Sequence, residues 1–381
     1  MTETANPGAT GLNVDATTLM GGGTIGHQIV VTAISIILGL LVGAILIILS
    51  GVIGPAATFD PTLPITAYGA LLEGSLGSPK TIANVLNSAT PLIFVGLSVS
   101  FAFRAGLFNI GGNGQFLVGA FCAAIIGANV GLPFPLAIVA AFFAGALGGA
   151  AWGFIPGALK AWRGAHEVVT TIMLNSTAAL LLQTLASGAF KDPGATFPRT
   201  PDILPAAVLG VILTDTRLHA GIFIAILSAV AVWFVLFKTV LGFEIRMVGA
   251  NASAARYAGI RPAFITVLTM SIAGGLAGMG GAVEIMGNTK NYPAEYFVSF
   301  GFDGIAVSLL GRAHPIGVIG AALLFGVLRA GSGAMQRASD IPVDIISIVQ
   351  GVILLFVAAQ VIIQRLIAPR ARRRQAAAAA A

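Results

Sequence analysis

Residues 105–159 read AGLFNIGGNGQFLVGAFCAAIIGANVGLPFPLAIVAAFFAGALGGAAWGFIPGAL and contain no Asp, Glu, Lys or Arg. About 20 consecutive apolar residues cross a bilayer as a helix, so this block is long enough for two crossings. The segment 131–135 holds two prolines and supplies a turn between them. The block therefore predicts a pair of membrane-spanning helices.

The rest of the chain has the same apolar character. Hydrophobic residues make up 57% of the 381 residues and charged residues 9%, whereas a soluble domain carries about 25% charged residues. These apolar residues do not alternate with polar ones as they do in the strands of a membrane barrel. Further runs without any charge are residues 16–59, 81–103, 168–190, 218–237, 262–283 and 345–364. We expect an all-α fold, a polytopic integral membrane helix bundle.

Placing helices on the apolar runs gives about ten transmembrane helices within residues 29–365. The expected spans are 29–53, 84–103, 112–130, 135–156, 167–187, 220–238, 263–286, 298–311, 315–333 and 344–364. The span 298–311 is too short for a full crossing. Residues 1–28 are expected to form a tail before the first span, and residues 366–381 a basic, Ala-rich tail after the last. An even number of spans places both tails on the same side of the membrane.

The placement of charges indicates which side that is. With both tails in the cytoplasm, the inside segments hold 13 Lys and Arg residues, and the outside segments and outer helix ends hold 7. Cytoplasmic loops of membrane proteins are enriched in Lys and Arg. The net charge of +6 is thus a signal of topology, and we expect the lipid bilayer rather than nucleic acid as its partner.

Glycines at four-residue spacing indicate where helix backbones approach each other closely. We single out three such ladders, at Gly39 and Gly43, at Gly274 and Gly278, and at Gly145, Gly149, Gly153 and Gly157. Either they pack helices within one subunit, or they mark a subunit interface or a moving helix.

Two polar features stand within the apolar spans. Residues Glu167, Thr171, Asn175 and Gln183 recur at multiples of four, so they share one helix face that should point into the protein or a wet cavity. Residues 108–115 read FNIGGNGQ, which does not favour a regular helix. This segment is either a polar turn at the inner surface or a break within the membrane that lines a cavity.

Motifs for catalysis and cofactor binding are absent from the sequence. No Gly-x-x-x-x-Gly-Lys-Ser/Thr phosphate loop occurs, and no His and Cys residues have metal-ligand spacing. Cys122 is the only cysteine, so no intramolecular disulfide can form. We expect no metal or cofactor on this chain, and a translocation function rather than an enzyme.

The loop 239–261 is the most distinctive polar segment. Asn251 can cap a short helix over Ala252–Tyr257, and Gly259 can end it. A short amphipathic helix in a cytoplasmic loop is suited to docking a soluble partner.

This loop resembles the coupling loop of ATP-binding-cassette importer permeases, in the group that serves sugars, nucleosides and branched-chain amino acids. The resemblance covers about residues 84–365, and its nucleoside-type motifs are residues 103–111, 167–175 and 302–311. The loop itself carries Gly249, then Ala-Ala-Arg-Tyr-Ala-Gly-Ile at 254–260, then Gly-Gly-Leu-Ala-Gly at 274–278. One departure is Asn113, which stands where the nucleoside-type subgroup commonly has an acidic residue.

The resemblance implies one half of a transmembrane channel in a bacterial inner membrane. A second permease subunit, expected to be a paralogous chain in a heterodimer, would supply the other half. ATP would bind to a separate ATPase subunit, and an extracytoplasmic solute-binding protein would deliver the solute. The residues implied in docking the ATPase are Gly249, Asn251, Ala254, Ala255, Arg256 and Gly259.

Amide and aromatic side chains are the candidates for the solute pathway. Amides donate and accept hydrogen bonds, which suits a neutral polar solute such as a nucleoside, and aromatic rings such as Phe116 could stack on a base. The candidates are Phe108, Asn109, Asn113, Gln115 and Asn175.

Two alternatives remain open at this stage. The same machinery could import a simple sugar. In another class, an ion-coupled secondary carrier would need no ATPase and would use intramembrane carboxylates, for which Glu284 and Asp303 are the candidates.

Overall fold

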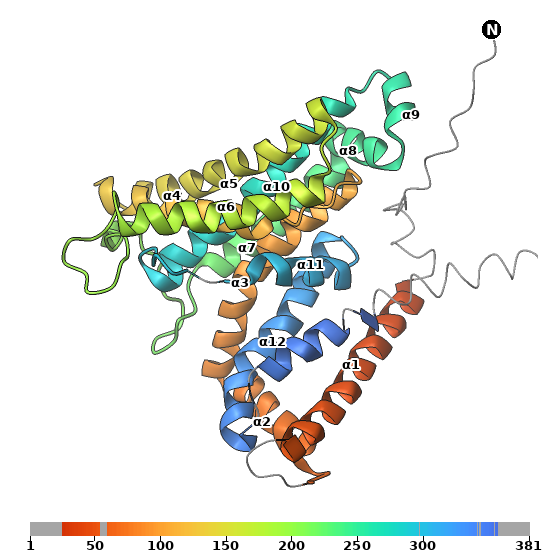
Figure 1. Cartoon of the computed structure of the whole chain (residues 1–381), viewed down its shortest axis with the longest axis vertical. Coiled ribbons are helices and arrows are strands. Elements are labelled where there is room, and N and C mark those ends of the chain that lie inside the picture. Colours follow the sequence, from red (N-terminus) through yellow and green to blue (C-terminus); the bar gives the residue numbers. More distant parts are fainter. Residues whose placement is uncertain are drawn as a thin grey trace, which may run out of the picture.

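The computed structural model describes residues 25–53, 59–296, 298–340, 342, 344–353 and 355–356. Within these residues the chain is a bundle of helices (Figure 1). The long helices are α1 (Ile25–Ile53), α3 (Pro79–Arg104), α4 (Gly112–Asn129), α5 (Leu136–Arg163), α6 (Glu167–Ser187), α7 (Gly221–Lys238), α10 (Pro262–Glu284) and α12 (Pro315–Ser339). The shorter ones are α2 (Leu63–Leu76), η1 (Pro205–Ala207), α8 (Val240–Ala250), α9 (Ala252–Tyr257), the π-turn η2 (Ile285–Thr289), α11 (Phe300–Leu310) and a helical segment Asp344–Ile353.

Seven helices of the described part are long and apolar enough to cross a membrane, namely α1, α3, α5, α6, α7, α10 with its π-turn, and α12. The prediction of an all-α polytopic membrane bundle is confirmed, and the expected number of about ten spans is approximate. The last expected span, 344–364, starts as a helix at Asp344, and its distal part lies outside the described residues. The expected tails, residues 1–24 of the first and all of 366–381, also lie outside them.

Helix α2 was not expected from the sequence. It has only 14 residues and includes Thr66, Tyr68 and Glu73, so its composition does not stand out as a span. Its Gly74 faces α12, where a Cβ atom would lie 2.2 Å from the Cβ of Ala334. Packing against α12 therefore stabilises a helix that its own composition does not predict.

The glycine ladder of α5 packs against the ladder of α10. A Cβ on Gly149 would lie 2.3 Å from the carbonyl oxygen of Gly274, and one on Gly278 would lie 2.3 Å from that of Gly145. Real Cβ atoms do not approach so closely, so only glycine allows this backbone contact. Gly39 and Gly43 of α1 likewise face other helices of this chain. All three ladders thus pack helices within one subunit, the first of the two expectations.

Figure 1 shows two lobes joined by α3. One lobe holds α4, α5, α6, α7 and α10 as a layer of nearly parallel helices, and the other holds α1, α2 and α12. Helix α3 is the most buried of the candidate spans and packs on α10 as well as on α12. It is therefore the central element to which both lobes are attached.

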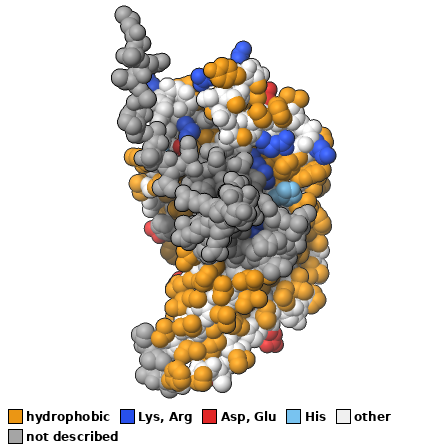
Figure 2. Space-filling view, turned by 90° about the vertical axis from the view of Figure 1, so that its right-hand side faces the viewer, with side chains coloured by type: hydrophobic (Ala, Val, Ile, Leu, Met, Phe, Trp, Pro, Cys, Tyr) orange, Lys and Arg blue, Asp and Glu red, His pale blue; other side chains and the backbone are white. Residues whose placement is uncertain are grey.

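Basic side chains gather at one end of the bundle. Figure 2 views the side where α8 and α9 lie, and several Lys and Arg side chains are grouped in its upper half, among hydrophobic ones. The elements that end or lie there carry basic residues at the C-terminal ends of α3, α5 and α7, within α8 and α9, and just before α10, namely Arg104, Lys160, Arg163, Lys238, Arg246, Arg256 and Arg261. We call this the basic end.

Candidate functional site

The connection from α3 to α4 turns back into the bundle. Helix α3 ends at the basic end with Arg104, but α4 begins at Gly112, where a Cβ would lie 3.2 Å from the side chain of Val95. Val95 lies nine residues before Arg104, which corresponds to about 13 Å along a helix. Segment 105–111 therefore returns into the bundle, and α4 starts inside the protein. Of the two interpretations of this polar segment, this arrangement favours the break over a turn at the surface.

The amides in this segment form a closed network with α3. Asn109 Nδ2 donates to Gln115 Oε1 at 2.8 Å and to Ser98 Oγ at 3.3 Å. In return, Gln115 Nε2 donates to Asn109 Oδ1 at 3.1 Å, and the Gly111 N–H donates to the same oxygen. Asn109 and Gln115 are buried, so these bonds stand in for those that water would make.

Asn175 of α6 caps the start of α4. The N-cap residue Gly111 has no side chain that could accept a hydrogen bond from the first turn. Instead, Asn175 Oδ1 accepts from the Gly114 N–H at 2.8 Å, and its Nδ2 donates to the Ile110 carbonyl at 3.0 Å. We define the inner polar network as Ser98, Asn109, Gln115 and Asn175. All four side chains are buried and have hydrogen-bond partners.

Asn113 links α4 to α11. Its Oδ1 accepts from the Gly301 N–H at 3.4 Å, and a Cβ on Gly301 would collide with the Asn113 backbone. Helices α4 and α11 thus begin against each other inside the bundle.

The two candidate aromatic residues differ in exposure. Phe108 is partly exposed, with its ring centroid 5.1 Å from that of Phe103. Phe116 is fully buried against Phe300. The structure therefore brings the five predicted pathway residues to one region, where only Phe108 and Asn113 are partly accessible. Their role in the pathway stays a prediction.

The loop expected to couple to a partner forms two helices at the basic end. Asn251 Oδ1 accepts from the Ala254 N–H at 3.0 Å and so caps α9, and Gly259 adopts a left-handed φ of +84° just after it. The short helix over Ala252–Tyr257 is therefore as predicted. Ala255 is buried beneath it, whereas Tyr257 is 95% exposed. Helix α8, which precedes it, was not expected.

The loop is anchored to α3 through backbone contact. A Cβ on Gly249 would lie 2.3 Å from the Arg104 carbonyl oxygen, and Gly106 on the other side has a φ of +71°. Both positions require glycine, the first because of space and the second because of its dihedral angle. Helix α8 and the end of α3 are thus in direct backbone contact.

A ring of side chains around Phe237 of α7 joins the same elements. The guanidinium groups of Arg104 and Arg246 lie 5.2 Å and 5.3 Å from the Phe237 centroid, in range of cation–π attraction. His314 stacks on the same ring at 5.5 Å, and Arg104 donates to the Ala313 carbonyl. Burial and the charge of Arg104 lower the pKa of His314, which favours the neutral imidazole beside the two cations.

We call Phe237 with Arg104, Arg246 and His314 the Phe237 junction. It connects α8 to α3, α7 and the start of α12. Sequence reasoning counted the two arginines only as inside charges and missed their common partner.

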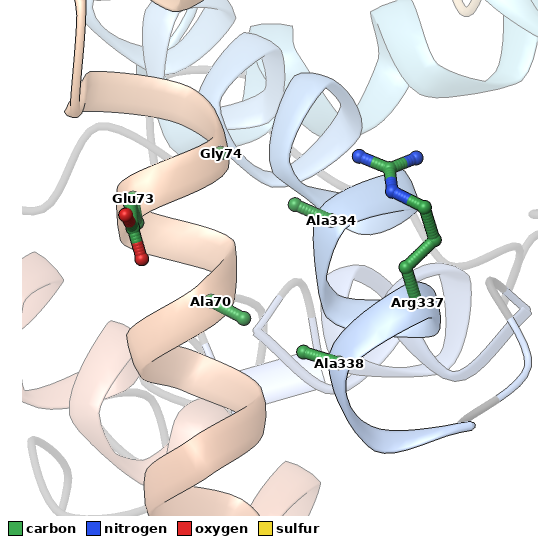
Figure 3. A pocket seen from close by; sticks show the side chains of 6 residues that line it. All are labelled: Ala70, Glu73, Gly74, Ala334, Arg337 and Ala338. Atoms are coloured by element: carbon green, nitrogen blue, oxygen red, sulfur yellow. The ribbon is translucent and has the colours of Figure 1, made fainter.

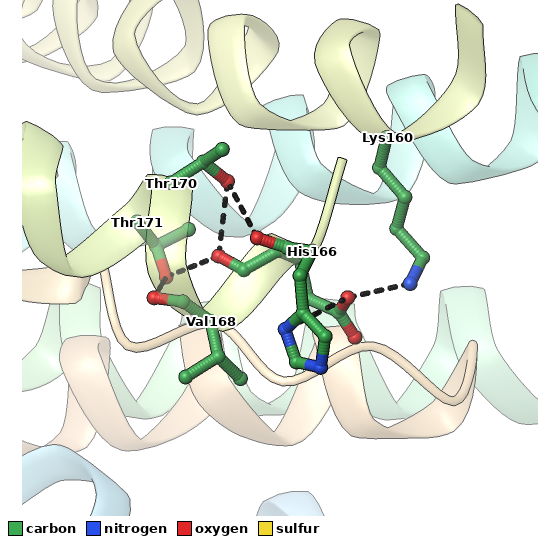
Figure 4. A network of polar contacts seen from close by, with 6 residues as sticks. Lys160, His166, Val168, Thr170 and Thr171 are labelled. Carbon is green, nitrogen blue, oxygen red and sulfur yellow. Dashed lines mark hydrogen bonds and ion pairs between the residues drawn. The ribbon is translucent and has the colours of Figure 1, made fainter. Parts of the chain in front are cut away.

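A clasp holds the α5–α6 turn at the same end (Figure 4). Lys160 of α5 pairs with Glu167, the first residue of α6, and His166 lies 4.0 Å from the same carboxylate oxygen. The hydroxyl groups of Thr170 and Thr171 donate hydrogen bonds to the carbonyl oxygens of the first turn, those of His166, Glu167 and Val168. A carboxylate at a helix N-terminus also stabilises the helix dipole. Of the four residues of the predicted polar face of α6, Glu167, Thr171 and Asn175 are buried as expected, whereas Gln183 is partly exposed.

At the opposite end of the bundle, a groove of about 300 Å³ lies between α2 and α12 (Figure 3). Small residues line it, with Glu73 and Arg337 at its two sides: Ala70, Glu73, Gly74, Ala334, Arg337 and Ala338. Among the described residues no group of three or more His, Cys, Asp or Glu side chains could hold a metal ion.

Similarity to known proteins extends over most of the chain. Residues 81–358 match the family described as branched-chain amino acid transport system / permease component. The guanosine ABC transporter permease protein NupP of Bacillus subtilis is 39% identical over 339 residues, which cover 87% of this chain and 93% of NupP. The nucleoside ABC transporter permease protein NupB of Lactococcus lactis is 35% identical, covering 91% of this chain and 94% of NupB.

A third relative carries a different solute in its name. The glucose ABC transporter permease protein TsgB13 of Haloferax volcanii is 34% identical, covering 77% of this chain and 80% of TsgB13. The same Bacillus strain that has NupP also has a second similar guanosine permease, NupQ. No solved structure matches the chain.

Proposed function

The chain belongs to the permease components of the branched-chain amino acid transport system family, and we propose that it is the permease of an ATP-driven importer for nucleosides. The observation that carries the proposal is the similarity to guanosine and nucleoside permeases over about nine tenths of this chain and of theirs. The residues that match the family, 81–358, include the turn 105–111, the polar face of α6 and the loop with α8 and α9.

Energy would come from a separate ATPase subunit docked on α9. The helix presents Arg256 and the exposed Tyr257 outward, whereas the buried Ala255 and the Gly249 contact fix it to the bundle. A partner that moves α9 would move α3 and α12 through the Phe237 junction. ATP would then shift the population between inward-open and outward-open states by binding one of them more tightly.

The basic end would lie in the cytoplasm, because Lys and Arg are enriched in cytoplasmic loops. Both termini would lie on that side. The second permease subunit would be a paralogous chain, since NupP and NupQ occur together in one organism. A solute-binding protein would dock at the opposite end.

The test of the solute is uptake by a strain from which this gene has been deleted. Complementation with the wild-type chain is expected to restore uptake of a labelled nucleoside, and unlabelled nucleosides are expected to compete. Competition by sugars alone would contradict the proposal. A chain that transports in the absence of its ATPase would instead support the ion-coupled carrier.

The test of coupling is the substitution Arg256→Glu in the assembled complex. We expect the solute-stimulated ATPase rate and the uptake rate to fall together, while the amount of folded permease is unchanged. Arg163→Glu, an exposed basic residue of α5 at the same end, serves as the matched control. Wild-type stimulation in Arg256→Glu would refute the docking role of α9.

Import of a simple sugar is the second candidate, favoured by the 34% identity to the glucose permease TsgB13. Both solutes are neutral and carry several hydroxyl groups, so amide side chains suit either. The competition experiment separates the two.

A further inference from the structure

A second group of polar side chains, each partly buried, lies far from the basic end, between α3, the end of α10 and the loop that follows it. We define the outer polar cluster as Asn87, Glu284, Asn288 and Tyr296. Asn87 lies 17 residues before Arg104 on α3, which corresponds to about 25 Å along the helix. The cluster is therefore in the outer half of the membrane if the basic end is inner.

Two hydrogen bonds join the cluster across elements. Asn87 Nδ2 donates to Asn288 Oδ1 at 2.9 Å, and Asn288 Nδ2 donates to Glu284 Oε2 at 2.9 Å. Asn288 lies on the π-turn, a rare helix geometry that is common at functional sites. Tyr296 comes from the following loop and interacts electrostatically with the Glu284 carboxylate.

The cluster holds hydrogen-bonding atoms that have no partner. The side-chain oxygen Oδ1 of Asn87 and the hydroxyl of Tyr296 are buried and have no hydrogen bond within the described residues. The hydroxyl of Thr289, on the same π-turn, is also buried without a partner. Most buried polar groups are paired, because an unpaired one keeps the full cost of leaving water. Three unpaired groups on neighbouring elements indicate a place where another molecule supplies the partners.

The charge of the cluster limits what that molecule can be. Glu284 has no ion pair within the described residues, whereas the nearby Arg329 of α12 is paired with Asp303 at 3.6 Å and lies 4.5 Å from the centroid of Phe300. Lys290, at the end of the π-turn, donates to the carbonyls of Met286 and Gly287, so the cluster itself carries one carboxylate and no cation. This excess of negative charge disfavours phosphorylated or other anionic solutes and favours neutral ones.

We propose that the outer polar cluster is a recognition site for the ribose hydroxyls of a nucleoside, which rests on the proposed function. The Glu284 carboxylate accepts hydrogen bonds from vicinal hydroxyls, Asn87 Oδ1 accepts another, and the Tyr296 hydroxyl donates or accepts. The site is closed in this structure because its unpaired atoms are buried. The solute enters when α3 and the π-turn separate, and it replaces the Asn87–Asn288 bond.

The test compares two solutes with the same base in the complete importer, reconstituted in proteoliposomes with its ATPase, second permease and binding protein. One solute is a ribonucleoside, and the other is its 2′,3′-dideoxy analogue, which lacks the hydroxyls. The ratio of their uptake rates in a variant, divided by the wild-type ratio, cancels the preference of the unchanged binding protein.

For Glu284→Gln we expect uptake of the ribonucleoside to fall by about tenfold or more, since a hydrogen bond to a charged group is lost. Uptake of the dideoxy analogue should change little. Tyr296→Phe removes one oxygen only and should shift the ratio in the same direction by about threefold. Glu73→Gln, an exposed carboxylate on α2, is the control and should leave the ratio unchanged.

Each outcome separates the two proposals. A wild-type complex that imports neither nucleoside would refute the proposed function. Normal wild-type import with equal loss of both solutes in Glu284→Gln, or an unchanged ratio in both variants, would refute the recognition site alone. Tyr296→Phe decides the matter if Glu284→Gln does not accumulate in the membrane, because it adds no charge or bulk.

Discussion

The inner polar network and the outer polar cluster are both built from amides at membrane depth, but they differ in how fully they are paired. Every side chain of the inner network has a partner, and Asn175 even replaces a missing helix cap. In the outer cluster, Asn87 and Tyr296 each leave an oxygen unpaired. A fully paired network specifies one conformation, whereas we propose that a solute completes the outer cluster. The first should therefore matter for folding, and the second for transport.

The largest effect is expected from Asn175→Ala in the inner network. It leaves the Gly114 N–H and the Ile110 carbonyl buried without partners, which should cost about 2–6 kcal/mol in free energy of unfolding. Thermal unfolding in detergent measures the loss, with Thr177→Val on the exposed face of α6 as control. Unchanged stability together with lost transport would reverse the assignment and place the solute at the inner network.

The next effect concerns pH, because a buried histidine lies at the outer end. His219 packs so closely on Gly221 and Gly287 that neither glycine has room for a Cβ. Burial, and secondarily the charge of Lys290, lower its pKa from 6.5 to about 4. Below pH 6.5 the unfolded state binds a proton at His219 that the folded state does not bind. The free energy of unfolding therefore falls as pH drops from 6.5 toward 4, by up to about 3 kcal/mol, and is unaffected by this group above pH 6.5.

His219→Asn tests this origin of the pH dependence. Asparagine can still accept the hydrogen bond that His219 Nδ1 accepts from the Gly221 N–H, but it does not titrate. The variant is expected to be less stable at pH 7 and to lose less stability between pH 6.5 and 4. If the free energy of unfolding has the same pH dependence in the two proteins between pH 6.5 and 4, the role of His219 is refuted.

A smaller effect is expected from the clasp between α5 and α6. Glu167→Gln removes the charge that Lys160 pairs with, and Lys160 is partly exposed, so the loss should be about 1 kcal/mol. Transport per folded molecule should stay at the wild-type rate. A loss of transport without a loss of stability would show that this end, too, has a direct role in the pathway.

The smallest change in stability is expected for Tyr296→Phe in the outer cluster. Removing a buried hydroxyl that has no partner should leave the free energy of unfolding unchanged or raise it by about 1 kcal/mol. Its effect on the ratio of solute uptake rates should nevertheless be measurable. A clear destabilisation would mean that the hydroxyl is paired in the folded state and would remove the contrast between the two regions.

Much of the fold could be predicted because long apolar runs in the sequence mark the helices that lie in lipid. The span 167–187 coincides with α6, and the span 112–130 differs from α4 by one residue at its end. The cap at Asn251 and the end at Gly259 defined α9 correctly. Helix α2 was missed because its stability comes from contact with α12, which is about 260 residues away in sequence and leaves no local pattern.

The candidate sites were predicted only in part, for the same reason. The amides of the inner network were identified by type, but their mutual pairing depends on how segment 105–111 folds back along α3. The Phe237 junction unites residues from four separate elements, and nothing in the spacing of Arg104, Arg246 and His314 reveals their shared ring. Glu284 was singled out as a membrane carboxylate, but its connection to Asn87 needs the tertiary structure.

The glycine seam between α5 and α10 has a consequence for how the molecule moves. The backbones in contact at Gly149 and Gly274 have no side chains that could rearrange, so we expect that α5 and α10 do not separate gradually. We expect α5 and α10 to move together as one rigid body. We expect any opening that admits a solute to lie along α3, where the two lobes meet. The transport cycle would then be a hinge motion of one lobe against the rigid α5–α10 pair.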